Sequence, residues 1–212
     1  MRAWTPSRHR RPDRRGFLLG AAGLLVATSS APAGADENGA RQFVQDVGDR
    51  TVAALRRAGS SNQQRLDELV GLLNTATDLD LVGRLVLGQY WRTATDGQRA
   101  EYTRLFKELV VKSMADRLNT YGGETFQITT AKPVDQRDTV VSTRIFRPGS
   151  GGQPIAVDWR VRQLDGRYSI IDIVAEGVSM VVTQRSEVAS VVSQKGMDGL
   201  IQTMRERLEG RA

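Results

Sequence analysis

The side chains that could do acid–base chemistry lie in one stretch in the last quarter of the sequence. Asp172 and Glu176 share one face of a predicted strand that also contains Tyr168. Four residues at about 3.3 Å each separate the two carboxylates by about 13 Å, which is more than the spacing of the carboxylate pairs that hydrolyse glycosides. An enzyme that uses Asp172 or Tyr168 as its acid or base in an apolar pocket therefore stays open only as an alternative.

The residue types that most often bind metals or act as nucleophiles are almost missing. The chain has no cysteine, and its one histidine is His9. Beyond residue 35 the sequence therefore excludes zinc sites of the common type, Cys–His pairs and Ser–His–Asp triads. Without disulfides the fold must depend on its core. We expect a protein that binds rather than catalyses, with no metal and no cofactor.

The first 35 residues have the features of an export signal. Arg14 and Arg15 precede an apolar run over residues 17–27, and small residues follow at 31–35. This pattern predicts twin-arginine export to the periplasm, with cleavage before Asp36. Without the six arginines and one aspartate of this segment, the chain keeps 24 basic and 23 acidic residues, and its net charge falls from +6 to +1. A nearly neutral protein without a basic block is not expected to bind nucleic acid.

Hydrophobic periodicity predicts helices, then strands, then helices again. Residues 36–40 are polar and are expected to form a flexible N-terminus. Apolar positions three and four apart predict helices over residues 41–58, 61–76, 79–87, 95–121, 178–195 and 197–208. Alternation with period two predicts strands over residues 126–133, 139–146, 155–164 and 168–176. This order predicts one α+β domain over residues 41–212, in which about six helices wrap a curved, four-stranded antiparallel meander sheet.

The fourth predicted strand is apolar on both faces. Ile170 and Val174 occupy one face, and Ile171, Ile173 and Ala175 occupy the other. A strand of this kind is covered on both sides. Gly177 then turns the chain, and we expect residues 178–182 to close one end of whatever space the sheet and helices enclose.

Three motifs resemble the MlaC (toluene-tolerance) family of periplasmic phospholipid carriers. They are the segment 87–92 (LGQYWR), the segment 168–180 (YSIIDIVAEGVSM) and the segment 196–201 (GMDGLI). The resemblance extends over about residues 43–208. It implies a shuttle that carries phospholipid between an outer-membrane lipoprotein complex and an inner-membrane ABC transporter complex with its membrane-anchored lipid-binding subunit.

The sequence departs from the family pattern at Tyr168-Ser169, at Thr183-Gln184 and in its twin-arginine signal. The identity of the lipid therefore stays open, and a hopanoid or another lipid is an alternative cargo. A structural adaptor with a solid core and one exposed apolar patch is a further alternative.

The resemblance places the acyl chains in an apolar cavity between the sheet and the helices. Burial of each methylene contributes about 0.8 kcal/mol, so one chain of about fifteen carbons contributes on the order of 10 kcal/mol before losses. Either face of the sheet could form the cavity. The candidate lining residues are the large apolar side chains of helix 95–121 and of the sheet: Phe106, Leu109, Val110, Met114, Leu118, Tyr121, Ile128, Ile145, Trp159, Ile171 and Ile173.

Overall fold

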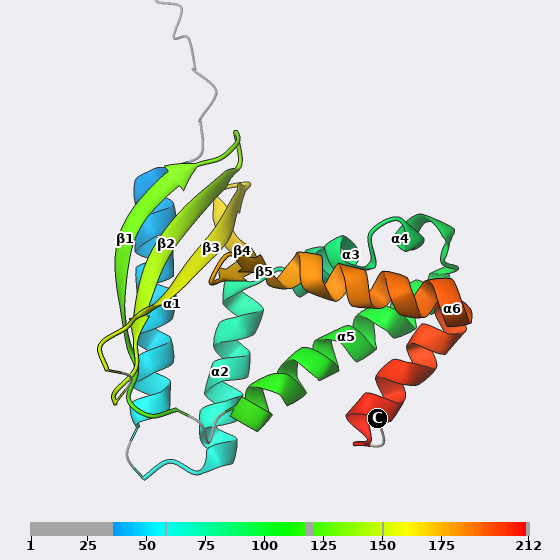
Figure 1. The fold of residues 1–212 in the computed structure, drawn as a ribbon, viewed down its shortest axis with the longest axis horizontal. Coiled ribbons are helices and arrows are strands. Elements are labelled where there is room, and N and C mark those ends of the chain that lie inside the picture. Colours follow the sequence, from blue (N-terminus) through cyan, green and yellow to red (C-terminus); the bar gives the residue numbers. More distant parts are fainter. Residues whose placement is uncertain (1–35, 58, 118–120, 150, 211–212) are drawn as a thin grey trace, which may run out of the picture. The chain divides into compact units, whose positions relative to one another are not determined.

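Capping side chains set where most of the helices begin. The computed structural model describes residues 36–57, 59–117, 121–149 and 151–210. Ser61 and Gln64 form a capping box, and Thr95 and Gln98 form a second one. The helices, shown in Figure 1, are α1 (Glu37–Arg56), α2 (Asn62–Ala76), α3 (Leu79–Leu87), the four-residue α4 (Tyr90–Thr93), α5 (Asp96–Arg117) and α6 (Met180–Leu208).

The segment 36–40, predicted to be a flexible N-terminus, contains the start of α1 in the structure. Asp36 caps α1, because its carboxylate accepts a hydrogen bond from the backbone N–H of Gly39 at 3.0 Å. The helix therefore begins at Glu37, and Ala40 is 1% exposed against the sheet. The polar residues that suggested flexibility are those of an ordinary helix start.

The sheet is antiparallel throughout and follows the order of the chain. It contains the four predicted strands and a short fifth one: β1 (Thr125–Pro133), β2 (Asp138–Phe146), β3 (Ile155–Leu164), β4 (Arg167–Ala175) and β5 (Val178–Ser179). The fifth strand forms because Glu176 and Gly177 both take positive φ angles, 50° and 80°, and return the chain onto β4. Only then does α6 begin, with Ser179 as its N-cap.

A bulge in β4 changes the predicted faces of that strand. Ile173 pairs with Trp159, but Ile170 pairs with Val161, so Ile171 is the extra residue. Because Trp159 and Val161 share a face, Ile170 and Ile173 share it too. The prediction that Ile170 and Ile173 lie on opposite faces is therefore wrong.

The inner face of the sheet, which includes Ile170 and Ile173, packs against α1 and α2. Val44 of α1 and Ala76 of α2 are buried there with Val141 and Val161, and Figure 1 shows α1 running along this face. A second core joins α3, α5 and α6, around Leu87, Tyr102 and Leu200. None of the helices in the described ranges is long and apolar enough to cross a membrane.

The outer face of the sheet holds a buried carboxylate. Asp138 is 0% exposed, and its two oxygens accept from Arg162 Nε at 2.7 Å and from Arg160 Nε at 2.8 Å. The two arginine side chains are 29% and 43% exposed, and they cover the carboxylate. This cluster connects β2 to β3 on the side away from α1.

Candidate functional site

The larger of two apolar cavities lies between the inner face of the sheet and helices α1 and α2. This sheet cavity has a volume of about 840 Å³. Its apolar walls include Val44, Val47, Val52, Leu55, Leu69, Leu72, Leu73, Ala76, Val110, Met114, Phe126, Ile145, Trp159, Ile170 and Ile173. A space of this size falls within the range of small-molecule binding sites.

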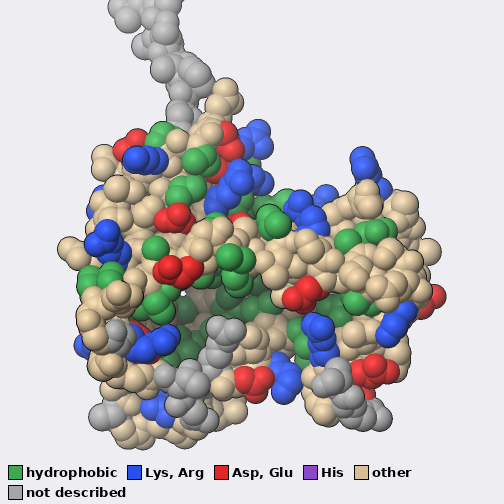
Figure 2. Space-filling model, in the orientation of Figure 1, with side chains coloured by type: hydrophobic (Ala, Val, Ile, Leu, Met, Phe, Trp, Pro, Cys, Tyr) green, Lys and Arg blue, Asp and Glu red, His purple; other side chains and the backbone are tan. Residues whose placement is uncertain are grey.

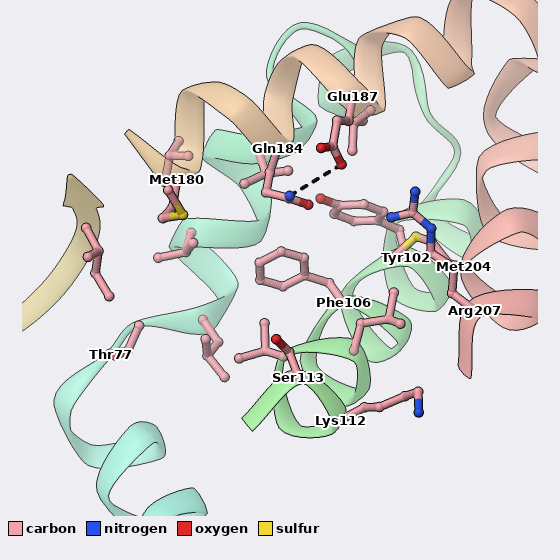
Figure 3. Close-up of a pocket in the computed structure, with 18 of the residues that line it drawn as sticks. Thr77, Tyr102, Phe106, Lys112, Ser113, Met180, Gln184, Glu187, Met204 and Arg207 are labelled. Carbon is pink, nitrogen blue, oxygen red and sulfur yellow. Dashed lines mark hydrogen bonds between the residues drawn. The ribbon is translucent and has the colours of Figure 1, made fainter. Parts of the chain in front are cut away.

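The second cavity lies between α3, α5, α6 and β4. This helix cavity has a volume of about 680 Å³, and Figure 3 shows Phe106 projecting into it. Gly196, at φ 70°, interrupts α6, and residues from both sides of the interruption face the cavity. Its apolar walls include Leu79, Val82, Val86, Phe106, Leu109, Val110, Met114, Ile170, Ile171, Ile173, Met180, Val181, Val188, Val191, Leu200 and Met204.

The two cavities adjoin along a common wall. This wall consists of Leu73, Thr77, Val110, Met114, Ile170 and Ile173, each of which lines both spaces. Figure 2 shows hydrophobic side chains inside a recess, with charged side chains along its edge. The arrangement can therefore hold long apolar groups and leave polar groups at the solvent boundary.

Most of the residues predicted to line a cavity do so, in two groups. Phe106, Leu109 and Ile171 face the helix cavity, Tyr121, Ile145 and Trp159 face the sheet cavity, and Val110, Met114 and Ile173 face both. Ile128 lines neither cavity, because it packs in the core between α1 and the sheet. Leu118 lies outside the described residues.

Sequence reasoning missed the walls that α1, α2 and α6 supply. Val47 and Leu72 line the sheet cavity, and Val188 and Met204 line the helix cavity. Their helical spacing was visible, but the same spacing is produced by side chains that fill a core. Residues 178–182, which were predicted to close one end of the enclosed space, lie in two different environments. Met180 and Val181 line the helix cavity, whereas Val178 and Val182 are exposed.

The polar edge of the sheet cavity is a hydrogen-bonded cluster. Arg56 Nε donates to the Tyr121 hydroxyl at 3.1 Å, and that hydroxyl donates to the Glu124 carbonyl at 3.2 Å. Arg147 Nε lies 3.3 Å from the Glu124 carboxylate. Backbone hydrogen bonds, and then Arg147, hold the pKa of Glu124 below its usual value.

The carboxylates considered for catalysis are bonded to the chain itself. Asp172 accepts from the Ser179 hydroxyl at 2.5 Å and from the backbone N–H groups of Val181 and Ile173, at 3.1 and 2.8 Å. Glu176 accepts from the backbone N–H of Ala156 at 2.5 Å. Asp172 therefore fastens β4 to the start of α6, which is a structural role.

Tyr168, the other candidate acid or base, lines neither cavity. Its hydroxyl donates to the carboxylate of Asp36 at 2.8 Å, and its ring stacks on Phe43. Burial, and then the hydrogen bond to Asp36, raises the pKa of the phenol. Among the described residues, no group of three or more Asp, Glu, His or Cys could hold a metal ion.

Replacement of Asp172 tests its structural role. We expect Asp172→Ala to lower the free energy of unfolding by about 1–3 kcal/mol, because the Ser179 hydroxyl and the Val181 N–H lose their acceptor. Chemical denaturation measures this change. Asp158→Ala, on the neighbouring strand β3, serves as the control and should change stability little. An Asp172→Ala variant as stable as the wild type would contradict the assignment.

Comparisons with known proteins agree on one family and one fold. A family model described as "MlaC protein" matches residues 45–206. The intermembrane phospholipid transport system binding protein MlaC of Haemophilus influenzae is 26% identical over 131 residues. That alignment covers 61% of this chain and 61% of the relative, so the chain spans less than two thirds of the relative's length.

A solved structure has the same fold. It is a phospholipid-binding protein from Ralstonia solanacearum in complex with a phospholipid, and it is 23% identical to this chain. The superposition has a TM-score of 0.70 and covers 81% of this chain and 98% of the other. The α+β architecture is thus shared by a protein that accommodates a phospholipid.

Proposed function

Because the chain belongs to the MlaC protein family, we propose that it is a lipid carrier that binds the acyl chains of a phospholipid without a covalent bond. The observation that carries the proposal is the pair of adjoining apolar cavities, of about 840 and 680 Å³. Their walls come from α1, α2, α3, α5, α6 and the sheet, so most of the fold takes part in enclosing the cargo.

The energetics of acyl-chain burial support this function. Each methylene moved from water to an apolar site contributes about 0.8 kcal/mol. Retention of a lipid therefore requires apolar walls and a mouth that leaves the headgroup in water, without a metal or a reactive side chain. The phospholipid in the Ralstonia solanacearum protein, which has the same fold, gives the proposed cargo its chemical class.

The proposed function includes a location in the periplasm and exchange of lipid with membrane complexes. The export signal expected at residues 1–35 would place the chain in the periplasm by the twin-arginine pathway. The name of the Haemophilus influenzae relative describes an intermembrane transport system. We propose that this chain likewise exchanges phospholipid with an inner-membrane ABC transporter complex and an outer-membrane lipoprotein complex.

Native mass spectrometry of the full chain, purified from the periplasm, tests the proposal. We expect an adduct with the mass of a phospholipid, which organic extraction and lipid mass spectrometry then identify. A hopanoid in the extract would support the alternative cargo. Protein that is consistently free of lipid, and that takes up none from vesicles, would contradict the carrier function.

A further inference from the structure

Two positively charged side chains lie at the edge of the helix cavity. Lys112 of α5 and Arg207 of α6 both line this space, although the rest of its surface is mainly apolar. Figure 3 shows the two side chains on the same side of Phe106, with the guanidinium of Arg207 close to Tyr102 and Met204. A positively charged group from α5 and one from α6 therefore both line the helix cavity.

Neither cation is firmly engaged by the protein. Lys112 Nζ lies 3.7 Å from the Asp116 carboxylate, and the two side chains are 41% and 65% exposed. An exposed pair at this distance contributes little to stability. Arg207 makes no side-chain hydrogen bond or ion pair with any other described residue. Both groups keep N–H donors for a ligand.

The sheet cavity offers no comparable pair. Arg147 at its edge is bonded to the Glu124 carboxylate, and Arg56 donates to the Tyr121 hydroxyl. A ligand that used the Nε–H of either guanidinium would have to compete with these bonds. Lys112 and Arg207 are thus less engaged by the protein than Arg147 and Arg56, although Asp116, Asp172 and Glu187 also line the helix cavity.

We propose that Lys112 and Arg207 form a phosphate-binding subsite that holds the headgroup of the lipid at the mouth of the helix cavity. The inference rests on the proposed carrier function. A guanidinium binds two phosphate oxygens through its parallel N–H groups, and an ammonium adds a point charge. With the acyl chains inside the cavity, the phosphate comes to the rim, where these donors lie.

Two acidic side chains also line the helix cavity, and they could contact the ammonium group of a zwitterionic lipid. Glu187 accepts from the Gln184 side-chain amide at 3.3 Å and lines the cavity together with Asp116. An ammonium on the headgroup can meet these carboxylates while its phosphate meets the cations. The chemistry that defines the subsite is nevertheless the phosphate, which all glycerophospholipids share.

A competition between two lipids tests the subsite. The lipid-free full chain is incubated with vesicles that contain equal amounts of a phosphatidylglycerol and a diacylglycerol with the same acyl chains. Mass spectrometry then gives the ratio of the two extracted lipids. We expect Lys112→Gln/Arg207→Gln to lower the preference for the phospholipid by about 10-fold to 100-fold, because charge-assisted hydrogen bonds are lost. Extraction of the diacylglycerol from vesicles that contain it without the phosphatidylglycerol should not change.

Lys132→Gln/Arg144→Gln is the matched control, because it removes the same charge from exposed positions on the sheet that line neither cavity. It should keep the wild-type ratio. A Lys112→Gln/Arg207→Gln variant with the wild-type ratio would overturn the subsite while the carrier function stands. Extraction of neither lipid by the wild type would contradict the carrier function, and this inference with it.

A further arm separates the two possible sources of phosphate. Inorganic phosphate is titrated into the lipid-free chain by calorimetry. Weak binding, or none, supports a headgroup site that depends on the buried acyl chains. Inorganic phosphate that binds as tightly as the phosphatidylglycerol would assign the site to the free ion and overturn the headgroup assignment.

Discussion

Val110→Asp is expected to abolish retention of lipid. Val110 is part of the common wall, so the new carboxylate faces both cavities. An acyl chain packed against an ionised carboxylate leaves that charge without water or a partner, which costs several kcal/mol. We expect the affinity for lipid to fall about 100-fold or more. Native mass spectrometry of the purified variant should show the mass of the polypeptide alone.

Val111→Asp is the matched control, because it adds the same charge to the next residue of α5, which lines neither cavity. It should retain wild-type amounts of lipid. Circular dichroism shows whether both variants are folded. Equal lipid content in a folded Val110→Asp variant and in the control would move the cargo to another site.

Asp138→Ala should give the largest loss of stability on the outer face of the sheet. The carboxylate is fully buried and neutralises Arg160 and Arg162. Its removal leaves Arg162 without its carboxylate partner and leaves Arg160 with only the exposed Asp135, at 3.5 Å. Loss of one partner of a buried pair costs about 3–5 kcal/mol. Because both arginines reach solvent here, we expect about 2–4 kcal/mol, measured by chemical denaturation.

The control for this prediction is Arg144→Ala. Arg144 is an exposed side chain of β2, and its replacement should change the free energy of unfolding by less than about 0.5 kcal/mol. Lipid content should stay unchanged in both variants, since neither residue lines a cavity. An Asp138→Ala variant as stable as Arg144→Ala would show that water compensates the arginines fully.

The helices could be predicted because their starting signals are local. Ser61 with Gln64, and Thr95 with Gln98, lie three residues apart in the sequence and form their capping bonds with each other. The start of α1 was misplaced because Asp36 gives a weaker signal, without an acid or amide three residues later. Its cap is evident only once Gly39 N–H is seen to bond to it.

The bulge in β4 could not be predicted, because it depends on the partner strand. Three of the four residues from Ile170 to Ile173 are isoleucine, and nothing in them indicates which residue is left unpaired. The register is set when Val161 pairs with Ile170 and Trp159 pairs with Ile173. Ile170 and Ile173 therefore share a face instead of lying on opposite faces; Ile170 and Ile171 are buried, and Ile173 is half-buried.

The site was predicted on one side only. The α5 positions 106, 109, 110 and 114 and the sheet positions 145, 159, 171 and 173 were identified as candidate walls, and each of them lines a cavity. The opposite walls on α1, α2 and α6 were not identified. An amphipathic stripe shows that a side chain is covered, but it does not show whether a packed core or a cavity covers it. Ile128 is the converse case, an apolar sheet residue that faces a filled core.

The common wall couples the binding of one apolar group in the sheet cavity to the binding of another in the helix cavity. Val110, Met114, Ile170 and Ile173 contact both cavities, so a rotamer that widens one space narrows the other. An apolar group in the sheet cavity must then change the affinity of the helix cavity for a second group. By thermodynamic reciprocity the second group changes the first affinity by the same factor. Two separate lipids whose acyl chains displace these shared side chains would therefore weaken each other's binding.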